Sequence, residues 1–62
     1  MQMITYKNVT DAIEAARAYY GHDTEAEQLW ELVHDALGVD RHSDAPNYHR
    51  FDRHFISAEG LG

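Results

Sequence analysis

The chain has 62 residues, no cysteine and a formal net charge of −6, so it forms at most one domain and holds neither a disulfide nor a thiolate metal site. Its charge opposes binding to nucleic acid or to an anionic membrane surface and favours basic partners. It has no apolar run as long as a signal peptide or as the roughly 18 residues of a membrane span, so we expect a cytoplasmic protein.

The first eight residues, 1–8, are predicted to form a short extended arm. Ile4 and Tyr6 alternate with Thr5 and Lys7, which is a weak strand pattern. The sequence offers no second strand, so the arm packs as coil or pairs with another chain.

A first helix is predicted over residues 10–20. Asn8 or Thr10 can cap its start, and Gly21 ends it. Its apolar face has six members at helical spacing: Val9, Ala12, Ile13, Ala16, Tyr19 and Tyr20. The opposite face consists of Asp11, Glu14, Arg17 and Ala18.

A second helix is predicted over residues 25–37. Thr24 and Glu27 match a capping box, and Gly38 ends the helix. Its apolar face consists of Ala26, Leu29, Trp30, Val33, Ala36 and Leu37. We predict that Trp30 is largely buried where the helices meet.

The outer face of this second helix carries a row of carboxylates, the acidic ridge, formed by Glu27, Glu31 and Asp35, with Gln28 and His34 beside it. Residues four apart are neighbours on a helix, so each like-charge pair costs about 0.2–0.5 kcal/mol. A purely structural helix gains nothing from this row, so either solubility or binding maintains it. Acidic residues are concentrated in 1–44, which hold nine acids and three bases, whereas 45–62 hold two of each.

A third helix is predicted over residues 46–57, with Asp44 or Ser43 as cap and Pro46 in the first turn. Its aromatic face contains Tyr48, Phe51 and Phe55, and is expected to fill the core. The opposite face is basic and consists of His49, Arg50, Arg53 and His54. The tail, residues 58–62, is expected to be flexible because it contains two glycines.

The basic face allows one functional alternative, a nucleic-acid-binding module that uses Arg41, Arg50 and Arg53. Against it stand the acidic net charge and a connector of about eight residues, longer than the 3–4-residue turn of a helix-turn-helix. His49 and His54 lack the i,i+4 spacing that lets two imidazoles share a zinc ion. The Ser, Asp and His residues have no spacing that links them in a catalytic set, so we expect no enzyme, metal or cofactor.

The sequence therefore predicts an all-α fold, a small three-helix bundle behind a short extended N-terminal arm, with a single strand or coil as the two alternatives for the arm. A core this small would gain from self-association, most simply as a two-fold homodimer. We expect a non-enzymatic protein-binding or regulatory module, such as an inhibitor or adaptor of the kind that phages and mobile elements encode. It would engage a basic protein through the acidic ridge, together with Asp23 and Glu25.

Overall fold

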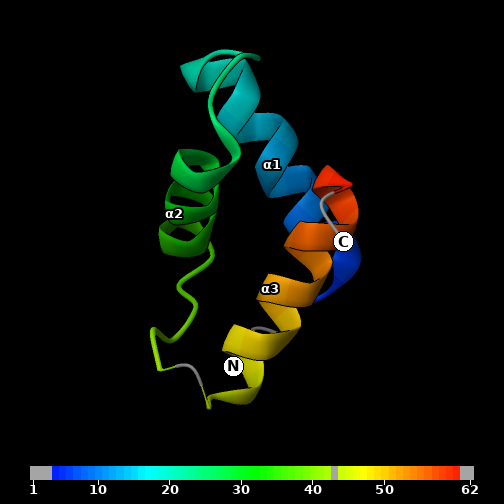
Figure 1. Ribbon diagram of the computed structural model, residues 1–62, viewed down its shortest axis with the longest axis vertical. Coiled ribbons are helices and arrows are strands. Elements are labelled where there is room, and N and C mark those ends of the chain that lie inside the picture. Colours follow the sequence, from blue (N-terminus) through cyan, green and yellow to red (C-terminus); the bar gives the residue numbers. More distant parts are fainter. Residues whose placement is uncertain (1–3, 43, 61–62) are drawn as a thin grey trace.

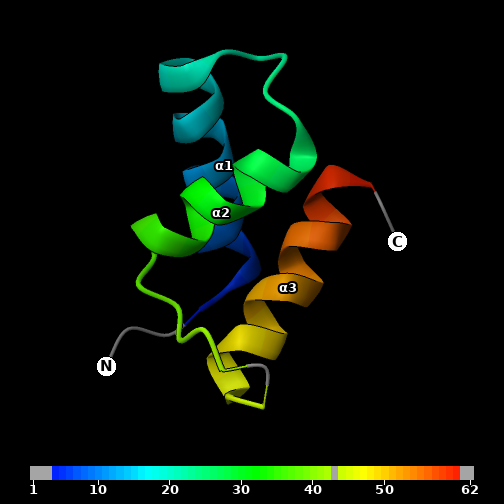
Figure 2. The same cartoon turned by 60° about the vertical axis from the view of Figure 1, so that its left-hand side comes forward.

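The computed structural model describes residues 4–42 and 44–60, and these fold into three helices (Figure 1). The helices are α1 (Tyr6–Tyr20), α2 (Ala26–Ala36) and α3 (Pro46–Glu59). The predicted all-α three-helix bundle is confirmed, and the described residues contain no strand. Helix α1 packs against both other helices, whereas α2 and α3 meet over a short stretch. Figure 2 shows α2 crossing α1 while α3 runs along the other side of the bundle.

Helix α1 begins at Tyr6, four residues earlier than predicted, because Thr5 caps it. The Thr5 hydroxyl accepts a hydrogen bond from the backbone N–H of Asn8 at 3.2 Å. The predicted caps were wrong: the Thr10 hydroxyl instead donates to the Tyr6 carbonyl at 2.9 Å. Residues 6–8 of the predicted arm are therefore helical, and the first three residues of the arm lie outside the described ranges.

Helices α2 and α3 have the predicted positions but not the predicted caps. The residue before α2 is Glu25, which makes no side-chain capping bond, and the Thr24 hydroxyl donates to the Gly21 carbonyl at 2.7 Å. The capping box is therefore absent. Pro46 does lie in the first turn of α3, but Ala45 rather than Asp44 is its N-cap, and Ser43 lies outside the described residues. Helix α3 runs two residues further than predicted.

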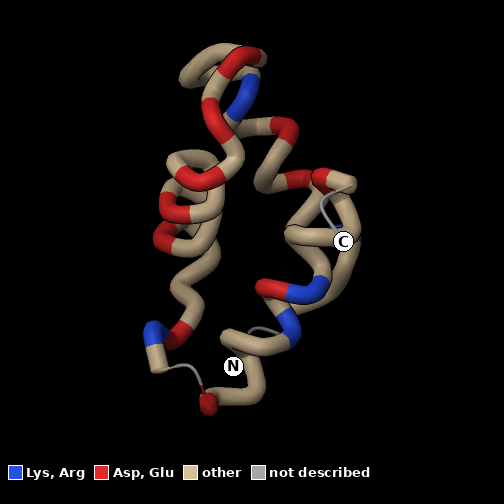
Figure 3. Tube along the Cα trace, in the orientation of Figure 1, with Lys and Arg blue, Asp and Glu red and all other residues tan. Residues whose placement is uncertain are grey.

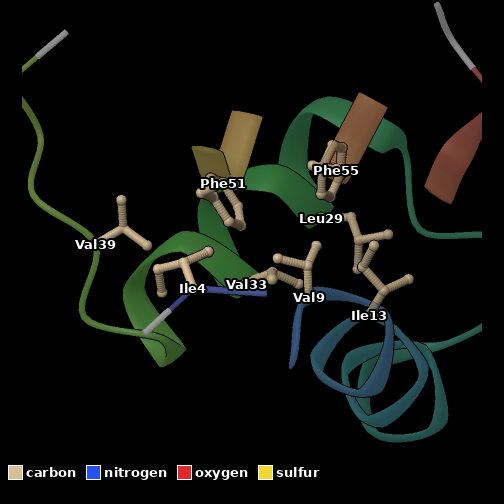
Figure 4. Close-up of a cluster of buried hydrophobic side chains, with 8 residues drawn as sticks. All are labelled: Ile4, Val9, Ile13, Leu29, Val33, Val39, Phe51 and Phe55. Atoms are coloured by element: carbon tan, nitrogen blue, oxygen red, sulfur yellow. The ribbon is translucent and has the colours of Figure 1, made fainter. Parts of the chain in front are cut away.

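The core consists of eight buried side chains from all three helices and from two non-helical segments (Figure 4): Ile4, Val9, Ile13, Leu29, Val33, Val39, Phe51 and Phe55. Six of these lie on the predicted apolar faces. The other two, Ile4 and Val39, come from the segments before α1 and after α2. These segments are therefore part of the packed structure and not loose connections.

Three residues of the predicted apolar faces are exposed, namely Ala36 on α2 and Tyr19 and Tyr20 on α1. Tyr19 and Tyr20 are 82% and 55% exposed, although they follow the helical spacing of the α1 apolar face. They form the last turn of α1, which extends beyond α2 (Figure 1). The periodicity identifies the correct face, but the partner helix is too short to cover its end.

An ion pair fastens the C-terminal ends of α1 and α3 together. The Arg17 guanidinium contacts the Glu59 carboxylate, and both side chains are largely shielded, with 24% and 11% of their surface exposed. The same guanidinium donates to the carbonyls of His22 and Thr24, at 2.8 and 3.3 Å. The prediction that Arg17 lies on the outer face of the first helix was therefore wrong. Its side chain instead joins α1, α3 and the turn that leads into α2.

Candidate functional site

The acidic ridge faces solvent along α2. Glu27, Glu31 and Asp35 are all exposed, as are Asp23 and Glu25 in the segment that leads into the helix. Figure 3 shows acidic residues gathered along α2 and this segment, whereas basic residues are few and dispersed over the chain. The five carboxylates expected to form a binding surface are therefore available to a partner.

One arginine from outside α2 neutralises part of the ridge. Arg41, in the connector after α2, contacts Asp35 Oδ1 at 2.5 Å and Glu31 Oε2 at 3.5 Å. All three side chains are more than half exposed, so each pair contributes only about 0–1 kcal/mol to folding. Glu27 takes part in none of the salt bridges found between described residues. The net negative charge is thus greatest at the N-terminal end of α2.

The three arginines of the nucleic-acid alternative differ in whether a carboxylate already pairs with them. Arg50 and Arg53 are exposed on α3, while Arg41 is held against the C-terminal half of α2 by its two carboxylate partners. The basic footprint that nucleic acid requires is therefore reduced to two arginines on one helix.

His34 was predicted to lie beside the ridge, but its side chain is buried, with 1% exposed. Its ring stacks on Trp30 with centroids 4.7 Å apart, and it meets the rings of Tyr48 and Phe51 edge to face. Its Nε2 atom has no hydrogen-bond partner among the described residues. The sequence signal that could have placed it is the i,i+4 spacing from Trp30, which sets the two rings side by side on one helix.

Trp30 was predicted to be largely buried, but it is only half-buried, because it lines a groove between α2 and α3. The α2–α3 groove has a volume of about 520 Å³, within the range of about 300–1,000 Å³ of ligand sites. Its apolar lining consists of Ala26, Trp30, Tyr48, Phe55 and Ile56. Three carboxylates also line it: Glu27 and Glu31 on α2, and Asp52 on α3. The groove therefore opens directly beside the acidic ridge.

A second groove, of about 370 Å³, lies between α1 and α2. Its lining contains alanines, Leu32, Val33 and the exposed Tyr19 and Tyr20, and it includes no charged residue.

Within the described ranges, no group of three or more His, Asp or Glu side chains is arranged to hold a metal ion. None of the described helices combines the length and apolar character needed to cross a membrane. Comparison with known proteins gives no match: no family model, no curated protein and no solved structure is significantly similar to this chain.

Proposed function

We propose that this protein is a non-enzymatic binding module that engages a basic protein surface through the acidic face of α2. The observation that carries the proposal is the exposure of five carboxylates along α2 and the segment before it, of which Arg41 neutralises only the C-terminal part. Such a field attracts a basic partner over long distances and speeds association, and added salt weakens it.

The experiment compares two variants of equal net charge. Asp23→Lys with Glu27→Lys reverses two exposed carboxylates that make no ion pair with any described residue. Glu14→Lys with Asp44→Lys makes the same change in charge at exposed positions away from the ridge. The partner is first identified by affinity purification from the native host and is then purified, so that the dissociation constant of each folded variant can be measured.

We expect the ridge variant to bind at least about tenfold more weakly than wild type, a loss of about 1.4 kcal/mol. The control variant should lose less, and wild-type affinity should fall as salt is raised from low to physiological concentration. Equal losses in the two variants would mean that only net charge matters, and the acidic ridge would then be a solvated face without a binding role.

A nucleic-acid-binding function is the weaker proposal, because only Arg50 and Arg53 remain outside the ion pairs described for Arg41. A homodimer is supported by the groove between α1 and α2, whose lining is apolar and uncharged. Two copies of net charge −6 would meet there on uncharged side chains.

A further inference from the structure

We infer that the α2–α3 groove receives an arginine side chain of the basic partner, an inference that rests on the function proposed above. The groove combines two kinds of lining, apolar and anionic, and a long cationic side chain is complementary to both. Trp30, Ala26 and Ile56 offer apolar contact, and carboxylates stand on both walls, from Glu27 on α2 and Asp52 on α3. An anion would be repelled, and an uncharged apolar ligand would take these carboxylates out of water without pairing them.

The carboxylates are available to a ligand to different degrees. Asp52 Oδ1 accepts a hydrogen bond from the Trp30 indole N–H at 3.1 Å, which orients the carboxylate and leaves its second oxygen to accept further bonds. Glu27 makes no ion pair within the described part of the chain, and Glu31 is contacted only at 3.5 Å by Arg41. Two walls of the groove therefore present acceptors to a donor placed between them.

The aromatic part of the groove is held in place before any ligand arrives. The Trp30 ring is stacked on His34, and its centroid lies 5.2 Å from that of Phe51 and 5.9 Å from that of Tyr48. A ring fixed in this way loses little conformational freedom when a ligand packs on it, which is the benefit of preorganisation.

These features favour arginine over lysine. A guanidinium is planar, stacks on aromatic rings and donates in a fixed fork that fits carboxylates, and it is less strongly hydrated than an ammonium group. Its aliphatic stem can pack on Ile56 and Ala26 while the charged head stays near the rim. A lysine would satisfy the charge, but it lacks the stacking plane and the paired donors.

The test uses the isotope-labelled full chain and three synthetic probes, which are short peptides of glycine alternating with arginine, lysine or citrulline. Citrulline keeps the shape of arginine without its charge. The chain has one tryptophan, so a single indole N–H resonance reports on the groove. We expect the arginine peptide to shift this resonance saturably and to bind about threefold to fivefold more tightly than the lysine peptide, because a guanidinium stacks on a ring and donates in a fixed fork and an ammonium does not. The citrulline peptide should leave it unchanged.

The first variant is Asp52→Asn, which keeps the size of the side chain and an acceptor for the indole. Its matched control is Glu14→Gln, at an exposed position of α1. Each removes one negative charge. Asp52→Asn should weaken binding of the arginine peptide by about threefold or more, as loss of one charge-assisted contact predicts, and Glu14→Gln should not. The amide spectrum of each variant shows whether it is folded, and the comparison of peptides on the wild-type chain does not depend on either variant.

Three outcomes would overturn the inference in distinguishable ways. Equal binding of the arginine and lysine peptides with no movement of the indole resonance would leave the acidic-ridge function standing and exclude the groove. Absence of binding by every cationic peptide at low salt would count against both. An indole resonance that moves with protein concentration alone would show that a second copy of the chain covers the groove.

Discussion

Replacing Trp30 with alanine tests how much the junction between α2 and α3 contributes to stability. The change removes a hydrogen bond to the Asp52 carboxylate and ring contacts with His34, Tyr48 and Phe51. Removing a large aromatic side chain from a core costs about 3–5 kcal/mol. Because Trp30 is half-buried, we expect the lower end of this range, about 3 kcal/mol.

That loss is large for so small a domain. At about 0.05–0.15 kcal/mol per residue, the whole chain has a free energy of unfolding of about 3–9 kcal/mol. The melting temperature of a domain of this size changes by about 4–8 °C per kcal/mol, so Trp30→Ala should lower it by about 12–24 °C or leave the chain largely unfolded. Circular dichroism during thermal unfolding, at fixed protein concentration, measures the shift.

A second variant separates the indole N–H from the ring. Trp30→Phe keeps an aromatic ring beside His34 but removes the donor to Asp52 and one of the two indole rings, so it should cost at least about 1 kcal/mol, less than Trp30→Ala, and lower the melting temperature by at least about 4–8 °C. The reasoning fails if Trp30→Ala melts at the wild-type temperature, because Trp30 would then be a surface residue that contributes nothing to the packing of α2 on α3.

Two further predictions concern other contacts. Arg17→Met and Glu59→Gln should each lower the free energy of unfolding by about 1–3 kcal/mol, since each leaves a shielded charged group without its partner. The double variant should lose less than the sum of the two single losses. Additive losses, measured by urea unfolding, would show that the ion pair contributes nothing to folding. Sedimentation equilibrium at micromolar concentration should give a mass above the 7.1 kDa of one chain, and Tyr19→Glu, which places a charge in the uncharged groove, should restore the monomer. A wild-type chain that sediments as a monomer would refute the proposed dimer.

The three helices and most of the core could be predicted because they depend on local spacing. Val9 and Ile13, Leu29 and Val33, and Phe51 with Phe55 recur at helical intervals, and all six are buried. Ile4 and Val39 carry no such signal. They lie outside the helices, and only the path of the chain around the bundle brings them into the core.

The helix caps were harder to predict because several residues of the same type compete for the role. Thr5, Thr10 and Thr24 all have the hydroxyl that a cap requires, and only Thr5 uses it as one. The hydroxyl of Thr24 donates to the carbonyl of Gly21 in the preceding turn, and Glu25 rather than Thr24 is the N-cap of α2. Which threonine caps a helix is decided by how the flanking segment packs, and the sequence pattern does not contain that information.

The predicted surface of α2 was incomplete for the same reason. Nothing in the spacing along α2 shows that Arg41 returns from the connector to Glu31 and Asp35. His34 was placed beside the acidic ridge, yet two aromatic residues of α3 bury it against Trp30. Both differences arise from contacts between elements, and both change the candidate site: one shifts the free charge toward Glu27, and the other supports the aromatic wall of the groove.

Asp52 is the residue at which folding and binding make different demands. Its side chain is half-buried, and the one hydrogen bond described for it comes from a neutral donor, the indole N–H of Trp30. An asparagine would still accept that bond, although more weakly than a carboxylate does, and it would cost less to remove partly from water because it carries no charge. These two effects oppose each other, so stability alone gives little reason for a carboxylate at this position, whereas a cationic ligand in the groove does. On this reasoning Asp52→Asn leaves the melting temperature unchanged or raises it, and it weakens binding of the arginine peptide. A variant that lost stability and kept its affinity for the peptide would assign Asp52 to the fold alone.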